Sequence, residues 1–255
     1  MASKLDLEIQ VSLNEVTVRR SEDVVGPLTV QIARGEFLSL VGPGTGKGLV
    51  LRAIAGLEPL ESGSIDFHDS GQPAARGLGF VFRDSALFPW RSVLGNVTLE
   101  AEIRRLDSRT CEQWALRLLA AMSLAGSENR RPCELLPEEA QRAAICRALL
   151  NKPSLLLLDD PFGSMDFAAR EHLVSDFQRL WMDFHFAVVL TTGDISEAVL
   201  LSDRIMLMSQ RPERIIQILE IDLPRPRRFD KATTPLMAEY ASRVRTIFRS
   251  QGLPY

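Results

Sequence analysis

Apolar residues occur along this chain in two alternating patterns. Short runs rich in Val, Ile and Leu, such as "EFLSLV" at 36–41 and "SLLLLD" at 154–159, are typical of buried strands. Longer segments have apolar residues three or four positions apart, as at 48–57 and 111–126, and predict amphipathic helices. Because strands and helices alternate, the sequence predicts a largely parallel sheet covered by helices, the α/β fold class.

The same patterns predict the order of elements along the chain. Strands are expected at 36–41, 63–68, 78–82, 154–159, 186–191, 204–209 and 214–223. Helices are expected at 48–57, 111–126, 137–150, near 164–184, at 194–202 and at 231–250. We therefore divide the chain into an α/β core at 1–88 and 151–222, an inserted helical subdomain at 89–150 and a helical tail at 223–255.

Composition narrows the class of protein further. The chain has 255 residues, 45% hydrophobic and 25% charged, as in soluble globular proteins. Its net charge of −3 argues against a nucleic-acid partner, because nucleic-acid binders carry a basic excess. Three cysteines without a C-x-x-C pair fit a reducing compartment. The N-terminus has no apolar stretch of signal-peptide length, and no run approaches the ~20 apolar residues of a membrane helix. We expect a cytosolic chain, or one that contacts a membrane only through partners.

The candidate chemistry begins at "VGPGTGKGLV", residues 41–50. A phosphate-binding loop reads G-x-x-x-x-G-K-[ST], with backbone N–H groups around the phosphates and a hydroxyl on Mg²⁺. Here only three residues separate Gly42 from Gly46, and Gly48 follows Lys47 without a hydroxyl. Lys47 and the following helix N-terminus still attract phosphate, so we predict weakened ATP binding and doubtful Mg²⁺ binding. A plain glycine turn is the alternative. The candidate binding residues are Gly42, Gly44, Thr45, Gly46, Lys47, Gly48 and Leu49.

Several further segments, in the same order, resemble the ATP-binding subunits of ABC transporters. They are "LRAIAGLEPLESGSI" at 51–65, "PSLLLLDDPFGSMD" at 153–166 and "DISEAVLLSDRIMLM" at 194–208. "FPWRSVLGNV" at 88–97 and "LPRPR" at 223–227 are similar to the importer branch for nitrate, sulfonates and taurine. The resemblance covers nearly the whole chain. It implies a P-loop NTPase (RecA-like) nucleotide-binding domain with an inserted helical subdomain.

The resemblance also assigns roles to positions whose residues here differ. Asp159 matches the position that supports the metal, and Asp160 matches the catalytic Glu, one methylene shorter. Two carboxylates at a strand end are otherwise simply solvated. Where the family has a Gln that touches Mg²⁺, this chain has Arg83, which either neutralises a phosphate or, as we favour, pairs with Asp84 at the surface. Gly193 stands at the position of the family's histidine, and that imidazole is lost.

The family's signature L-S-G-G, which clasps the nucleotide of a partner subunit, matches Leu135, Leu136, Pro137 and Glu138. This sequence starts a helix well, with Pro at its first position, but its acids would repel a triphosphate. The family's adenine-stacking aromatic is absent near 13–23, where Arg19 or Arg20 either stacks a base or is exposed.

Three functions remain open from the sequence. The favoured one is a degenerate nucleotide-binding subunit of an importer for small anions, peripheral at the cytoplasmic face of the inner membrane, which scaffolds or regulates with impaired hydrolysis. Its implied partners are transmembrane permease subunits, docked at Phe88, Pro89 and Trp90, and a second ATP-binding subunit. The alternatives are a slow but genuine ATPase and an interaction protein without a role in transport.

Overall fold

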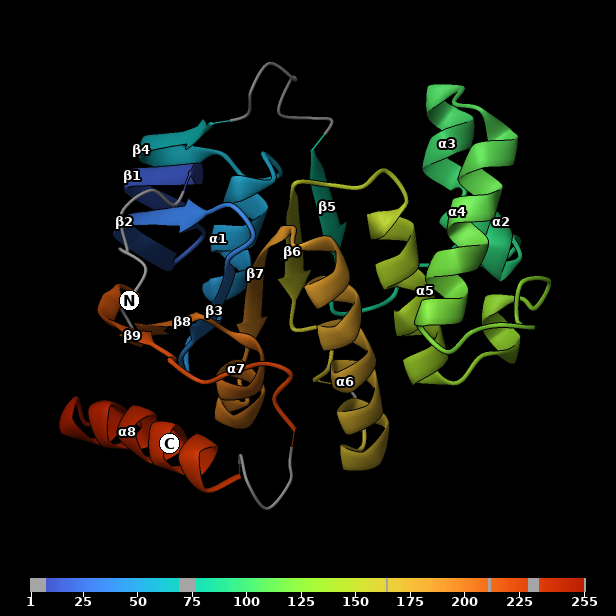
Figure 1. Ribbon diagram of the computed structural model, residues 1–255. Coiled ribbons are helices and arrows are strands. Elements are labelled where there is room, and N and C mark those ends of the chain that lie inside the picture. Colours follow the sequence, from blue (N-terminus) through green and yellow to red (C-terminus); the bar gives the residue numbers. More distant parts are fainter. Residues whose placement is uncertain (1–7, 69–76, 164, 211, 229–233, 255) are drawn as a thin grey trace.

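A six-stranded sheet forms the centre of the molecule (Figure 1). The computed structural model describes residues 8–68, 77–163, 165–210, 212–228 and 234–254. The strand order is β5 (Leu78–Val81), β6 (Leu155–Asp159), β7 (Ala187–Thr192), β3 (Phe37–Val41), β8 (Arg204–Met208) and β9 (Ile215–Glu220). The first five are parallel, which confirms the α/β class, whereas β9 runs antiparallel to β8. The short β8–β9 connection explains this, because a parallel pair needs a longer crossover.

A second, three-stranded antiparallel sheet lies beside the first. Its order is β2 (Asp23–Ala33), β1 (Ile9–Arg20) and β4 (Leu60–Phe67). The sequence analysis assigned β4 but missed β1 and β2. In β1 the register shifts between Leu13 and Val16 and again before Val18, so the apolar residues do not keep the period of two on which strand prediction relies.

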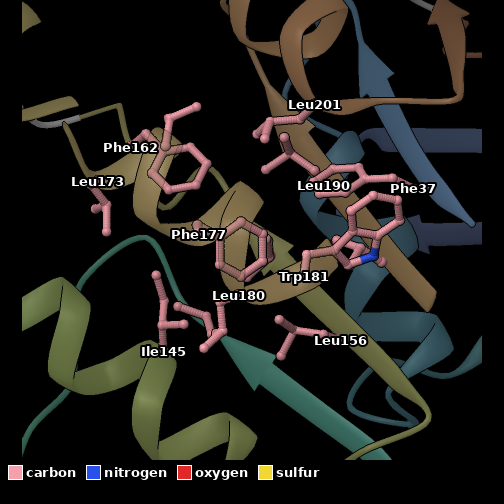
Figure 2. Packing of buried hydrophobic residues seen from close by; sticks show 14 of the residues in the cluster. Phe37, Ile145, Leu156, Phe162, Leu173, Phe177, Leu180, Trp181, Leu190 and Leu201 are labelled. Atoms are coloured by element: carbon pink, nitrogen blue, oxygen red, sulfur yellow. The ribbon is translucent and has the colours of Figure 1, made fainter. Parts of the chain in front are cut away.

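Alternate side chains of the parallel strands point into two hydrophobic layers. Leu38 and Leu40 face helix α1 (Lys47–Ile54) and the antiparallel sheet. Phe37 faces α5 (Pro137–Leu149), α6 (Phe167–Phe184) and α7 (Ile195–Leu201). There its ring meets those of Phe177 and Trp181 edge-on, at centroid distances of 6.2 and 5.6 Å (Figure 2). Burial on both faces accounts for the continuous apolar runs.

The remaining helices lie at two edges of this core (Figure 1). The predicted helical subdomain contains α2 (Val93–Val97), α3 (Leu99–Arg104) and α4 (Ser108–Ala121), followed by a 3₁₀ turn at Pro132–Glu134 and α5. The predicted tail helix is α8 (Thr234–Ser250), and residues 231–233 of that prediction lie outside the described residues. One face of α8 joins the same hydrophobic cluster as α7, through Met237, Ala241, Val244 and Phe248. Among the described residues, no helix combines the length and the apolar character needed to cross a bilayer.

Candidate phosphate-binding site

The glycine loop, the two aspartates, Arg83 and Gly193 meet at the carboxyl ends of β3, β6 and β7, where α/β sheets commonly bind ligands. A pocket of about 750 Å³ lies there. Its lining includes Gly42, Gly44, Thr45, Lys47, Gly48, Leu49, Arg83, Asp159, Asp160 and Gly193. Gly46 is buried at the base of the same loop. Leu135, Leu136, Pro137 and Glu138 do not line this pocket.

The glycine loop already holds an anion from its own chain. The N–H of Gly46 donates to both carboxylate oxygens of Glu213, each at 2.9 Å. Glu213 follows β8 in the connection to β9, and only 3% of it is exposed. Sequence reasoning missed this residue, because nothing in the local "RPERI" pattern relates it to a loop 167 positions earlier.

The Lys47 ammonium is directed at its own loop. It donates to the carbonyl oxygens of Gly42 and Gly44, both at 2.5 Å. Burial lowers the pKa of Lys47, while the negative charges of Glu213, Asp160 and Asp159 oppose that shift. The lysine thus lies at the predicted position and is satisfied by internal partners.

Two carboxylates end strand β6. Asp159 accepts a hydrogen bond from the Thr191 hydroxyl at 3.1 Å and lies 3.8 Å from the Arg52 guanidinium. A Cβ added to Gly48 would come within 3.0 Å of Asp159 Oδ1, so this carboxylate lies directly against the residue that lacks the hydroxyl.

Asp160 has a different environment. Its backbone adopts φ 48°, in the left-handed region, and its N–H donates to the Thr191 carbonyl at 3.0 Å. Burial raises the pKa of Asp160, and the positive charge of Arg83 opposes this. Arg83 Nη2 lies 3.4 Å from Asp160 Oδ2. Within the described part of the chain, its ion pair is therefore with Asp160, and the expected pairing with Asp84 is wrong.

The position of the missing imidazole lies open to solvent. Gly193 follows β7 directly, and a Cβ built on it meets no atom within 4 Å. His185 precedes β7, at the opposite end of the strand, and therefore does not replace that imidazole. Beside Gly193, buried Glu197 accepts a hydrogen bond from the Thr192 hydroxyl at 2.6 Å, and burial raises its pKa to about 7.

The predicted signature segment starts helix α5. Pro137 is its first residue, as expected, and Leu136 before it is 58% exposed. Glu139 in the first turn accepts the Leu136 N–H at 2.8 Å and pairs with Arg130 at 2.9 Å. Burial opposes the shift, but these two contacts hold the pKa of Glu139 below its usual value. Glu139 thus caps the N-terminus of α5 through the Leu136 N–H, whereas the other acid of the first turn, Glu138, makes no such capping contact among the hydrogen bonds described.

Two further predicted regions lie at the surface. Arg19 pairs with Glu61 at 2.9 Å, and Arg20 pairs with Glu58 at 3.4 Å while lining the large pocket.

The loop Phe88–Trp90, the predicted permease contact, also lies at the surface. Trp90 is 69% exposed, its ring centroid lies 5.1 Å from that of Phe88, and the intervening residue in the sequence, Pro89, is exposed. The buried Asn96 side chain accepts the Phe88 N–H at 2.7 Å and donates to the Phe88 carbonyl at 3.1 Å, so this aromatic loop is fixed in shape.

As arranged here, the residues do not fit a magnesium–triphosphate group. A phosphate oxygen at the Gly46 N–H would have to displace the Glu213 carboxylate. Gly48 offers no hydroxyl to a metal. Arginines pair with Asp159, the last residue of β6, and with Asp160 directly after it.

Comparisons with known proteins agree with the fold. Residues 25–163 match the family model described as ABC transporter. The aliphatic sulfonates import ATP-binding protein SsuB of Bacillus subtilis is 34% identical, over 98% of both chains. The SsuB of Ralstonia nicotianae is 40% identical over 80% of this chain and 70% of its own. Among solved structures, MJ0796, a bacterial ABC transporter cassette determined as a dimer, matches with a TM-score of 0.71 and 25% identity, over 84% of this chain and all of its own. The chain therefore belongs to the ABC transporter family and has the fold of its ATP-binding cassettes.

Proposed function

We propose that this chain is a subunit of an importer complex for small anions of the nitrate, sulfonate or taurine kind, in which it scaffolds or regulates with impaired ATP hydrolysis. The names of its relatives support the importer: two that match over most of this chain carry aliphatic sulfonate import in their names. The segments 88–97 and 223–227 support the same branch.

One observation carries the impaired hydrolysis. Strands β3, β6 and β7 pair without any shift of register up to their carboxyl ends. The residues that follow these ends, however, differ from those that the family uses to bind and hydrolyse ATP. Gly193 supplies no imidazole after β7, Gly48 supplies no hydroxyl at the start of α1, and Arg83 reaches Asp160 where the family has an amide. ATP and Mg²⁺ are therefore weak ligands in this proposal. A second ATP-binding subunit would supply hydrolysis.

The aromatic loop is the proposed contact with a permease at the cytoplasmic face of the membrane. Trp90 is exposed while Asn96 fixes the loop beneath it. A cavity of about 490 Å³ opens between α2, α3 and α4, and Ser92, two positions after Trp90 in the sequence, is part of its lining. Exposed aromatic side chains are common at protein–protein interfaces.

Native purification followed by mass spectrometry of the co-eluting chains tests the complex. We expect permease chains and a second ATP-binding chain to co-elute with the wild type, and Trp90→Ala to lose the permease. Leu236→Ala removes a 48%-exposed apolar side chain from α8 and serves as the matched control. Purification with a soluble target and no membrane chain would contradict the proposal and favour an interaction protein outside transport.

A slow ATPase is the second candidate, and one observation favours it. Lys47, Asp159 and Asp160 all line the same pocket. Phosphate release above background that Lys47→Ala abolishes would establish this alternative.

A further inference from the structure

Several hydrogen bonds fix the connection between β8 and β9, which contains Glu213. The Ser209 N–H donates to the Arg214 carbonyl at 2.9 Å, and the Ser209 hydroxyl donates to the Pro212 carbonyl at 2.6 Å. The carbonyl of Glu213 itself accepts the N–H of Gly26 at 2.8 Å. Its backbone is thus held from both the β8–β9 hairpin and strand β2, which places the side chain in one direction.

That direction leads into the glycine loop, and the loop is shaped to accept it. A Cβ at Gly44 would lie 2.4 Å from the Glu213 carboxylate, and one at Gly46 would lie 2.6 Å from it. A side chain at Gly44 would collide with the carboxylate, and one at Gly46 would collide both with it and, more closely, with Val25 Cγ2 at 2.2 Å. The two glycines therefore admit the glutamate as closely as they would admit a ligand.

The electrostatics of the contact match those of a phosphate. The acceptor is an anion at the N-terminus of α1, where the helix dipole and backbone N–H groups favour negative charge. The positive charge of Lys47 interacts with the same carboxylate. Hydrogen bonds to ionised acceptors are about twice as strong as neutral ones, and Glu213 is almost fully removed from water.

We propose that Glu213 is an internal ligand that takes the position of a phosphate group in the shortened loop and thereby determines that the site excludes external phosphates. The inference rests on the proposed function only in treating this pocket as a former nucleotide site. It adds a specificity-determining residue, since the glutamate competes directly with any polyphosphate for the N–H of Gly46.

The cationic side of the pocket contributes less to this exclusion. Arg52 pairs with Asp159 at 3.8 Å, and Arg83, 66% exposed, pairs with Asp160 at 3.4 Å. Partly exposed ion pairs of this kind stabilise the structure little, so a phosphate can displace them at low cost in free energy. Buried Glu213 is therefore the group whose removal should reopen the site.

Calorimetric titration of the full chain tests this with inorganic pyrophosphate and with ADP, both without Mg²⁺. Glu213→Ala removes the internal ligand, and Glu213→Gln keeps its shape without its charge. Glu220→Ala removes an exposed glutamate from strand β9 as the matched control. We expect both Glu213 variants to bind pyrophosphate at least about tenfold more tightly than wild type, because an internal competitor reduces the apparent affinity in proportion to the fraction of sites that it leaves open. Lys47→Ala in the Glu213→Ala background should abolish the gain.

Either result decides the inference. If Glu213→Ala does not fold, Glu213→Gln carries the comparison. No gain in the folded variants, or wild-type binding as tight as theirs, overturns the role of Glu213. The proposed function fails separately, through ATP hydrolysis by the wild type or the absence of permease partners.

Discussion

Gly48 and Gly193, which stand where the resemblance predicts a hydroxyl and an imidazole, have opposite surroundings. A Cβ on Gly48 would lie 3.0 Å from Asp159 Oδ1, so a restored hydroxyl requires that carboxylate to shift. A Cβ on Gly193 would meet open space, so a restored imidazole fits without rearrangement. The two positions therefore differ: a side chain at Gly48 requires the Asp159 carboxylate to move by a few tenths of an ångström, whereas a side chain at Gly193 has open space around its Cβ.

Glu197 gives a prediction at the same scale. Its pKa is raised from 4.5 to about 7, chiefly by burial and further by Asp194, while Thr192 and Arg170 oppose the shift. The folded chain therefore binds this proton more tightly than the unfolded chain does. Its contribution to stability is present at low pH and is lost as pH rises from about 4.5 to 7. Glu197→Gln should remove that loss, roughly 1–3 kcal/mol.

The measurement is urea unfolding at pH 5 and pH 7.5. The free energy of unfolding of wild type should fall more between these values than that of Glu197→Gln, whose amide oxygen still accepts the Thr192 hydroxyl. Exposed Glu112→Gln should behave as wild type. Equal pH dependence in Glu197→Gln and wild type would show that Glu197 does not hold a proton near neutrality.

Among the elements, the segment 223–227 after β9 shows how a charged motif stabilises the fold. The guanidinium of Arg227, 3% exposed, donates to the carbonyls of Val199 at 2.7 Å and Ser202 at 2.6 Å. It also donates to the carbonyls of Ile221 and Leu223. Burial, followed by the neighbouring Arg225, lowers its pKa to about 10, so it remains charged at neutral pH. It joins the end of α7 to the segment that leads to α8.

Arg227→Met should therefore lower the free energy of unfolding by about 2–4 kcal/mol, because it leaves buried carbonyls without donors. Arg117→Met, at an exposed position of α4, should change it by about 0.5 kcal/mol or less. Chemical unfolding monitored by circular dichroism measures both. A cost for Arg227→Met as small as that of the control would contradict the role of Arg227.

How much of the fold was predictable also depends on the element. The parallel strands and their helices follow from continuous apolar runs and helical periodicity, as in 154–159 and 137–150. Strand β1 was missed because shifts of register interrupt its alternation. Strand β2 was missed although Leu28, Val30 and Ile32 alternate with exposed residues, a pattern of period two that the sequence contains. The antiparallel direction of β9 follows from its short connection to β8, which predicted strand ranges alone do not reveal.

The site was predictable where it is local in sequence. The glycine loop and the two aspartates were identified from adjacent residues, and they line one pocket. The partners of those groups come from distant positions: Glu213 reaches Gly46 across 167 positions, and Arg83 reaches Asp160 in place of its neighbour Asp84. Such contacts depend on tertiary packing, which neighbouring residues in the sequence do not reveal.

At the scale of the whole molecule, the residues that hold the fold together are, apart from Leu49, different from those of the candidate ligand site. Two hydrophobic layers cover both faces of the sheet and include α8. None of the replaced groups at Gly48, Arg83 or Gly193 belongs to these layers. Substitutions at these three positions therefore leave the two hydrophobic layers that hold the cassette together unchanged.

Steady-state hydrolysis of MgATP by the purified wild-type chain tests this view most directly, with Lys47→Ala measured in parallel. Since the reacting groups are replaced and Glu213 fills the loop, we expect phosphate release by the wild type to equal that of Lys47→Ala. Release at the rate of an ordinary transporter ATPase, abolished by Lys47→Ala, would contradict the account.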